Sequence, residues 1–180
     1  ILPDCYNKAM RTVAIAAITL DGRIALGPDH FSDWTSPEDK VFMRSLLDEA
    51  DVVVVGNNTY KTAIEPLSKR NCIVLTGSVA DTERKSARLL YVNPANADMK
   101  DILGHYKMVP ILGGAKTYSY FLQNNLLDEL YLTIEPVVFG RGISLFEHAE
   151  GIPAHFSLLS MKKLNEKGTV LLRYSIAAAK

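Results

Sequence analysis

The fold class is decided by the stretch Val109–Asn125, which reads VPILGGAKTYSYFLQNN. Val109–Leu112 is a short apolar run typical of a buried strand, and Lys116–Asn125 has the pattern of a helix. Gly113-Gly114 joins the two segments, so the chain passes directly from strand to helix. Such a strand–turn–helix unit favours a parallel sheet covered by helices.

The same alternation continues on both sides of this stretch. Further strands are expected at Thr12–Leu20, Asp51–Val55, Asn71–Thr76 and Glu129–Phe139. Helices are expected at Ser36–Ala50 and, from a weaker pattern, at Ala97–His105. A closing antiparallel pair is expected at Phe156–Lys162 and Val170–Ala177. The sequence therefore predicts an α/β fold with a mostly parallel sheet, helices on both faces and an antiparallel edge.

The composition is that of an ordinary globular protein. The chain has 180 residues, with 20 Lys and Arg against 20 Asp and Glu, so no basic face indicates nucleic acid or an anionic membrane. The longest apolar runs, such as Asp51–Gly56, are too short to cross a bilayer. We expect a single domain over residues 1–180, with residues 177–180 resembling a tag remnant.

The two cysteines, Cys5 and Cys72, lie far apart and fit no metal-binding spacing, so no metal site is expected. The chain does not begin with a charged segment followed by an apolar one. We therefore expect a cytoplasmic protein that handles a small molecule, as a monomer or a homodimer.

Asp39 is the first candidate for chemistry. In a helix it shares one face with Met43, Leu46 and Leu47, and that face is otherwise apolar. A carboxyl group held in a pocket there would have a raised pKa and could donate a proton. The alternative is a solvated acid in the first turn that interacts with the helix dipole.

Two turns that follow buried strands are the second and third candidates. Gly113-Gly114-Ala115 and Gly56-Asn57-Asn58-Thr59-Tyr60 would expose free backbone N–H groups at one edge of the sheet. Together they could hold the two ends of a dinucleotide. The alternatives are a tight turn without a ligand for the first and an Asn-rich helix cap for the second.

The order of several motifs resembles dihydrofolate reductase over nearly the whole chain. Trp34-Thr35-Ser36-Pro37-Glu38-Asp39 is similar to the family's Trp-x-x-Pro-x-Asp/Glu segment. Gly56-x-x-Thr59-Tyr60 resembles its Gly-Arg-x-Thr-Trp/Tyr turn, and Leu112-Gly113-Gly114-x-x-x-Tyr118 its Ile-Gly-Gly-x-x-x-Tyr turn. Pro66-Leu67-x-x-Arg70 and Tyr131-Leu132-Thr133 also match. The resemblance implies a three-layer fold with a mostly parallel eight-stranded sheet, flanking helices and an antiparallel C-terminal edge hairpin.

The resemblance also implies an activity, which is reduction of 7,8-dihydrofolate to 5,6,7,8-tetrahydrofolate with NADPH. Asp39, Trp34 and Thr133 would be the catalytic residues, with Asp39 supporting protonation of the ring and Trp34 ordering a water molecule. Arg70 would bind the carboxylate of the folate tail. The implied substrate-binding residues are Asp39, Met43, Leu67, Arg70, Leu112 and Thr133.

The implied cofactor site spans several loops. Its residues are Ala17, Ile24, Gly27, Gly56, Asn57, Asn58, Thr59, Leu75, Thr76, Gly77, Ser78, Leu112, Gly113, Gly114, Ala115, Lys116, Thr117 and Tyr118. Asn57 replaces the family's usual Arg, which grips the 2′-phosphate of NADPH. NADH therefore remains an alternative cofactor, although Lys61, Arg84 or Lys116 could take the place of that Arg.

A second family on the same fold also resembles the chain, the pyrimidine reductase of riboflavin synthesis. Leu20-Asp21-Gly22-Arg23-Ile24-Ala25 and Glu135-Pro136-x-x-Phe139-Gly140 look like its motifs. This family's substrate Lys in the first strand is missing from Val13–Thr19. We therefore expect a dihydrofolate reductase first and a reductase of 5-amino-6-(5-phosphoribosylamino)uracil as the alternative. A nucleotide-binding module without turnover is a third interpretation.

Overall fold

The computed structural model describes residues 10–147 and 153–176. In these ranges nine strands form the main sheet in the order β10-β11-β8-β1-β7-β3-β4-β6-β5, and β2 and β9 form a small second sheet. The strands are β1 (Arg11–Thr19), β2 (Arg23–Ala25), β3 (Val53–Gly56), β4 (Cys72–Leu75), β5 (Thr82–Ser86), β6 (Leu89–Val92), β7 (Met108–Ile111), β8 (Glu129–Glu135), β9 (Ile143–Ser144), β10 (Phe156–Lys163) and β11 (Val170–Ile176). The helices are the 3₁₀ helix η1 (Ser32–Trp34) and α1 (Pro37–Asp48), α2 (Asn57–Thr62), α3 (Ile64–Leu67), α4 (Met99–Leu103) and α5 (Ala115–Gln123).

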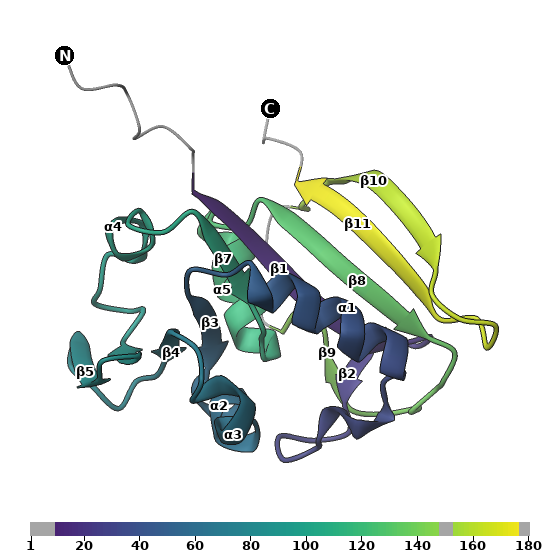
Figure 1. Ribbon diagram of the computed structural model, residues 1–180, viewed down its shortest axis with the longest axis horizontal. Helices are drawn as coiled ribbons and strands as arrows, with labels where there is room; N and C mark the ends of the chain where they lie inside the picture. The colour runs from purple at the N-terminus through teal and green to yellow at the C-terminus, as the bar shows by residue number, and fades with distance from the viewer. Residues whose placement is uncertain (1–9, 148–152, 177–180) are drawn as a thin grey trace.

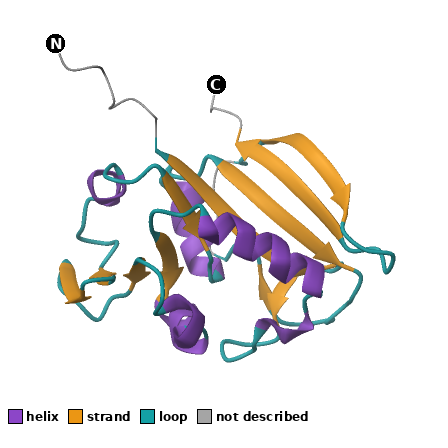
Figure 2. Ribbon diagram, viewed as in Figure 1, coloured by secondary structure: helices purple, strands orange, loops and turns teal. Residues whose placement is uncertain are grey.

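The predicted class of fold is confirmed. Figure 1 shows α1 in front of the sheet and α5 behind it, which gives three layers. The strands from β8 through β1, β7, β3 and β4 to β6 pair in parallel, whereas β11 pairs antiparallel with both β8 and β10. The predicted antiparallel C-terminal hairpin is therefore present at one edge, where Figure 2 shows β10 as the outermost strand.

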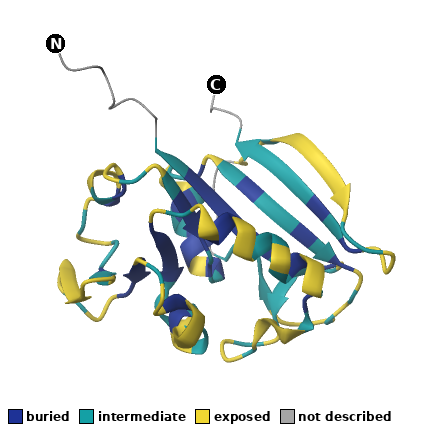
Figure 3. Cartoon of the chain, in the orientation of Figure 1, coloured by how far each residue is buried: buried dark blue, intermediate teal, exposed yellow. Residues whose placement is uncertain are grey.

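The core is divided between the two faces of the sheet. Val53 and Val55 belong to the cluster that includes Leu46 and Leu47 of α1, whereas Val54 belongs to the cluster that includes Phe121 of α5. All three valines are almost fully buried, as is typical of parallel strands covered on both faces. Figure 3 shows this buried centre, with the exposed edge strands β5 and β10 on either side.

The main sheet has nine strands rather than the predicted eight. The hairpin of β5 and β6 was missed because β5 reads TERKS, which is exposed along its whole length and has no alternating apolar residues. Expected strand Glu129–Phe139 ends at Glu135, because Pro136 lacks an N–H and the chain then turns to pair with Leu20. Ala177 of the expected strand Val170–Ala177 lies outside the described residues, as do residues 178–180.

The expected helix Ala97–His105 is shorter than predicted and is observed as α4, Met99–Leu103. Asp98 caps it by accepting hydrogen bonds from the N–H groups of Lys100 and Asp101. None of the helices within residues 10–147 and 153–176 combines the length and the apolar character that a bilayer-spanning helix needs.

Candidate active site

Asp39 occupies the first turn of α1 and points toward the sheet. Ser36 caps the helix, since its Oγ accepts the Asp39 N–H at 3.3 Å, and Pro37 follows as the first helical residue. The Asp39 side chain is 6 % exposed and lies on the helix face that buries Leu46 and Leu47. The carboxyl group is therefore held in the protein and is not a solvated acid at the helix start.

The surroundings of Asp39 favour its protonated form. Burial raises the pKa of the carboxyl group above its ordinary value, and the negative charge of Glu135 raises it further. The nearby hydroxyl groups of Thr133 and Thr35 act in the opposite direction, as does Lys40. Since burial is the largest of these effects, Asp39 retains a proton at a higher pH than an ordinary aspartate does.

The substrate-side residues expected around Asp39 come together on one face of the sheet. Leu67 is buried in the apolar cluster beneath α1, and Met43 and Leu112 pack against that cluster. Phe42 stacks at a tilt on Tyr131, with the ring centroids 5.3 Å apart. An apolar surface of this kind, next to one buried carboxyl group, can hold a flat ring with a polar edge.

Arg70 lies at the opposite end of α1 from Asp39. Its guanidinium donates hydrogen bonds to the Leu47 carbonyl and, at 2.6 Å, to the Asp48 carboxylate. Leu47 lies eight residue positions after Asp39 in the helix, which corresponds to roughly 12 Å along the axis. Arg70 can therefore reach only the far end of a substrate whose ring lies at Asp39.

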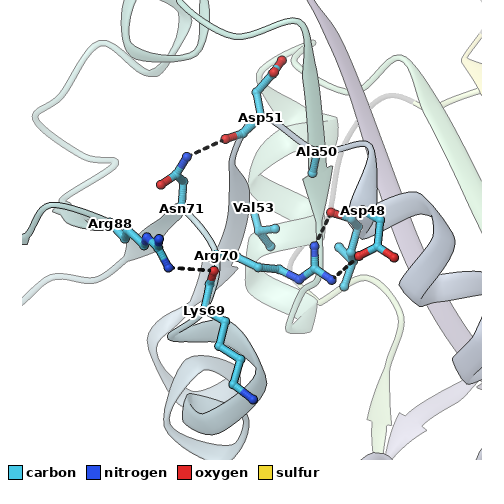
Figure 4. A pocket seen from close by; sticks show the side chains of 9 residues that line it. Asp48, Ala50, Asp51, Val53, Lys69, Arg70, Asn71 and Arg88 are labelled. Carbon is cyan, nitrogen blue, oxygen red and sulfur yellow. Dashed lines mark hydrogen bonds and ion pairs between the residues drawn. The ribbon is translucent and has the colours of Figure 1, made fainter.

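Figure 4 shows the cavity of about 340 Å³ beside Arg70. It carries two further cationic side chains, Lys69 and Arg88, and Arg88 donates to the Lys69 carbonyl at 3.2 Å. Asp48 and Asp51 also line it, so the cavity carries charges of both signs. Arg70 is already paired with Asp48, and Figure 4 shows the Lys69 side chain directed away from Arg70, so an anionic group at the end of a substrate would compete with Asp48 for the Arg70 guanidinium.

The two glycine turns expected to bind a dinucleotide contact each other directly. The Gly56 N–H donates to the Gly113 carbonyl at 2.6 Å. A Cβ at Gly56 would lie 2.7 Å from the Thr117 hydroxyl, and one at Gly114 would lie 3.4 Å from the Thr59 hydroxyl. A side chain at Gly56 would therefore clash with the second turn, whereas one at Gly114 would only touch the Thr59 hydroxyl.

The residues of these turns have donors that fit a phosphate-bearing cofactor. Neither Gly56 nor Gly114, the N-cap residues of α2 and α5, provides a side-chain hydrogen bond to its helix, so asparagine does not cap α2. The first backbone N–H groups of α5, those of Ala115 and Lys116, are therefore not capped by a side chain. Such a helix N-terminus favours an anion.

Other members of the expected cofactor set are committed to contacts within the protein. Tyr118 is fully buried, its hydroxyl donates to the Ile15 carbonyl at 2.6 Å, and its ring packs on Gly113. After Leu75, the last residue of β4, the Thr76 hydroxyl donates to the Ser78 hydroxyl at 2.9 Å and accepts the Ser78 N–H at 3.1 Å. These contacts shape the walls of the expected site. Gly77, in the turn that follows β4, has open space around it.

The expected nicotinamide border lies close to Asp39. Ala17 of β1 is the register partner of Thr133 of β8, the residue that donates to Asp39. Ile24 belongs to β2, and a Cβ at Gly27 would meet nothing within 4 Å. This placement brings the expected cofactor and substrate regions together at Thr133.

Trp34 lies in η1 just before the helix that carries Asp39. Its ring packs edge-on against Phe139, with the centroids 5.0 Å apart. Its Nε1 atom is buried and has no hydrogen-bond partner among the described residues. A buried N–H donor of this kind needs an acceptor, which water or a bound ligand would provide.

Glu135 is a buried carboxyl group near Asp39 that received no role in the sequence analysis. It is 4 % exposed, and its two oxygens accept hydrogen bonds from the Ser36 N–H and the Thr169 hydroxyl, both at 2.7 Å. Thr133 and Glu135 are two residues apart in β8 and are both buried. The period of two in a strand is the signal that places them on the same face.

Among the described residues, no three His, Cys, Asp or Glu side chains are grouped so as to hold a metal ion. A buried carboxyl group beside an apolar surface, with two glycine turns at the edge of the same sheet, is the arrangement expected of a nicotinamide-dependent oxidoreductase. The chain belongs to the dihydrofolate reductase family, because the model of that family, described as "Dihydrofolate reductase", matches residues 11–147.

Individual relatives agree with this assignment. Over 178 residues the chain is 28 % identical to dihydrofolate reductase type A13 of Escherichia coli, covering 95 % of this chain and 96 % of that protein. It is 29 % identical over 171 residues to the uncharacterized protein YwjB of Bacillus subtilis, covering 88 % and 90 % of the two chains.

Solved structures of pyrimidine reductases share the fold. One is a diaminohydroxyphosphoribosylaminopyrimidine deaminase/5-amino-6-(5-phosphoribosylamino)uracil reductase from Thermotoga maritima, with a TM-score of 0.71 and 19 % identity. The match covers 94 % of this chain and 57 % of that one. At this identity the similarity concerns the fold.

Proposed function

We propose that the protein transfers a hydride from a reduced nicotinamide to a carbon–nitrogen double bond of an aminopyrimidine-type substrate. The observation that carries this proposal is the Asp39 carboxyl group, which is buried, held by Thr133 and Thr35, and placed at the edge of an apolar surface. The adjacent glycine turns offer uncapped backbone donors for the phosphates of the cofactor.

The reduction needs a hydride and a proton. A bound reduced nicotinamide supplies the hydride to the carbon of the C=N bond. The electrons of the π bond then pass to the nitrogen, which must take up a proton. Burial raises the pKa of Asp39 above its ordinary value, so Asp39 is the group that would deliver this proton, directly or through a water molecule bound at the unpartnered Trp34 Nε1.

The first candidate substrate is 5-amino-6-(5-phosphoribosylamino)uracil, the substrate in the name of the Thermotoga relative. Opening of its ribosylamine ring gives an imine, which is the C=N bond that the hydride would reduce. Two sequence motifs that resemble the pyrimidine reductases form one contact, because the Asp21 carboxylate accepts the N–H groups of Phe139 at 3.1 Å and Gly140 at 2.9 Å. The cation-bearing cavity at Arg70 would face the phosphate of this substrate. The Asp21 contact favours the pyrimidine over our first expectation of a folate, whereas the cavity would suit the anionic group of either substrate.

The second candidate is 7,8-dihydrofolate. Asp39 and Thr133 lie together and could both bind the polar edge of a pterin ring. The end of α1 at Arg70 is roughly 12 Å from Asp39, and this separation suits a substrate with a spacer before its anionic group. The Escherichia coli relative of type A13, which is a dihydrofolate reductase, matches along almost its whole length.

One assay separates the candidates. The loss of NADPH absorbance is followed with 5-amino-6-(5-phosphoribosylamino)uracil, then with dihydrofolate, and each reaction is repeated with NADH. Faster oxidation with the pyrimidine supports the first candidate, and faster oxidation with dihydrofolate supports the second. Cofactor binding without oxidation under either substrate would contradict the proposed function and would leave a nucleotide-binding module. The Asp39→Asn variant is the control for enzymatic rather than contaminating turnover.

A further inference from the structure

Glu135 accepts the N–H of Ser36, the N-cap residue of α1, from outside the helix. Ser36 and Asp39 have the spacing of a capping box, in which the acid at the third helical position accepts the N–H of the N-cap residue. Half of that motif is present, because Ser36 Oγ accepts the Asp39 N–H. The other half is not, because the Ser36 N–H is bound by Glu135 at 2.7 Å instead.

This exchange leaves the Asp39 carboxyl group available for other partners. A carboxyl group that accepted the Ser36 N–H would be turned back along the helix toward its own N-cap. Asp39 instead interacts with the hydroxyl groups of Thr133 and Thr35. Glu135 reaches the helix from the end of β8, 99 residues later in the chain.

Glu135 is itself fixed from a third element. Its second oxygen accepts the Thr169 hydroxyl at 2.7 Å, and Thr169 is 1 % exposed. Asn165 donates to the Thr169 hydroxyl at 3.0 Å and to the Glu38 carboxylate at 3.1 Å. The loop between β10 and β11 therefore anchors the start of α1, and both Glu135 oxygens accept hydrogen bonds as an ionised carboxylate does.

The ionisable groups around Asp39 come from three elements. Lys40 belongs to α1 itself, Glu135 comes from β8 and Tyr118 from α5, and each of these interacts electrostatically with Asp39. Glu38, also on α1, is exposed and is held by Asn165. Of these groups Glu135 is the buried acid, and its charge adds to the effect of burial on Asp39.

We propose that Glu135 is a positioning residue for the reaction. By binding the Ser36 N–H, Glu135 leaves the Asp39 carboxyl group free to face the substrate, and it places a negative charge beside Asp39. The expected effect of Glu135 on turnover rests on the proposed function. Its effect on the titration of Asp39 is independent of any substrate.

The test uses Glu135→Gln in the full chain. The glutamine oxygen can still accept the Ser36 N–H, so the fold should be retained while the charge is removed. The pKa of Asp39, measured by carbon-13 NMR of the side-chain carboxyl groups and assigned with Asp39→Asn, should fall because the neighbouring negative charge is gone. The high-pH limb of the turnover profile should move to lower pH by the same amount, with little change in KM.

Thr169→Val is the matched control. It removes one hydrogen bond from Glu135 but keeps its carboxyl group, so stability should fall while the Asp39 titration stays near that of the wild type. Glu135→Asp withdraws the charge by one methylene group, and the Asp39 pKa should then lie between the wild-type and Glu135→Gln values. This variant carries the test alone if Glu135→Gln does not fold.

An Asp39 titration that is unchanged in Glu135→Gln, or in Glu135→Asp if only that variant folds, would overturn the inference. A protein that oxidises NADPH with neither candidate substrate would refute the proposed function, but the NMR titration would still decide the role of Glu135. An equal shift in Thr169→Val would also overturn the inference, because a structural disturbance would then explain the effect.

Discussion

Asp39 is placed where an ionised carboxylate is costly. Burial and the charge of Glu135 both favour the protonated form, and the hydrogen bonds from Thr133 and Thr35 offset only part of that effect. A raised pKa suits a group that must hold and release a proton during a reaction. The same feature lowers the stability of the folded protein at high pH.

Replacing Asp39 by asparagine should therefore stabilise the protein at alkaline pH. Because the folded-state pKa of this acid is raised, the folded protein binds the proton more tightly than the unfolded chain, and stability falls as pH rises between the two pKa values. Below the ordinary value of 3.8 the difference between variant and wild type should be smallest. Denaturant unfolding at several pH values measures this, and a wild type as stable as Asp39→Asn at alkaline pH would count against a buried, unfavourable charge.

Gly113 is a second residue whose identity the structure explains. Its φ is +86°, and a Cβ there would lie 2.7 Å from the Tyr118 ring, which is fixed by its hydrogen bond to Ile15. Gly113→Ala should destabilise the protein by about 1–3 kcal/mol and weaken dinucleotide binding. Gly77→Ala, with open space around its Cβ, is the control and should unfold close to the wild-type midpoint. Equal stability of the two variants would contradict this packing.

At the scale of elements, three strands are joined by one charged cluster. Glu129 of β8 accepts hydrogen bonds from Arg11 of β1 at 2.9 and 2.7 Å and from Arg173 of β11 at 2.7 and 3.1 Å. Burial would raise the pKa of Glu129, but the two guanidinium groups outweigh it and lower the pKa to about 2. The cluster thus holds the antiparallel edge of the sheet against its parallel centre.

Glu129→Gln should lower stability by about 1–2 kcal/mol at neutral pH, since both guanidinium groups are about a third exposed and partly screened. Because the folded-state pKa is lowered, this stabilisation is present above the ordinary value of 4.5 and is lost as pH falls toward 2. Glu83→Gln, which breaks an exposed pair with Lys85, should have little effect. Thermal unfolding from pH 7 to acid measures both, and a loss for Glu129→Gln that persists at the lowest pH would be inconsistent with this account.

At the scale of the whole molecule, the expected cofactor site is built from loops that follow several strands of one sheet. The turns after β3 and β7 are in direct contact, and the turn after β4 lies beside them because β3 and β4 pair in parallel. Ligands of open α/β sheets bind at this carboxyl edge. Binding should therefore stabilise the folded molecule as a whole.

NADPH at a hundred times its Kd should raise the Tm by about 5–10 °C. NADH, which lacks the 2′-phosphate, should raise the Tm less than NADPH if a lysine binds that phosphate in place of the Arg that Asn57 replaces. Lys61 on α2 and Lys116 on α5 are exposed and are the candidates. A thermal shift assay with both dinucleotides, repeated on Lys116→Ala, measures the difference. Equal shifts would show that the 2′-phosphate is not recognised, and no shift with either would contradict the cofactor expectation.

The sequence predicted the parallel sheet and the edge hairpin, because periodic apolar residues and turn glycines report local structure and its exposed side. It left Asp39 open between a buried group and a solvated acid, and the structure shows the buried group. It missed β5 because an exposed, charged strand lacks that pattern. It did not assign Glu135, whose contacts with Ser36 and Thr169 join residues that are 99 and 34 positions apart. Contacts of this kind depend on the packing of whole elements, which no local pattern contains.

The most direct test of the central claim is the rate of hydride transfer in a single turnover, compared between wild type and Asp39→Asn across pH with the preferred substrate. The wild-type rate should fall as pH rises through the raised pKa of Asp39, since the proton is then lost. At neutral pH the variant should be slower by about 10²–10⁴-fold, with substrate binding largely retained. Equal rates for the two proteins at neutral pH would contradict the role of Asp39 in the reaction.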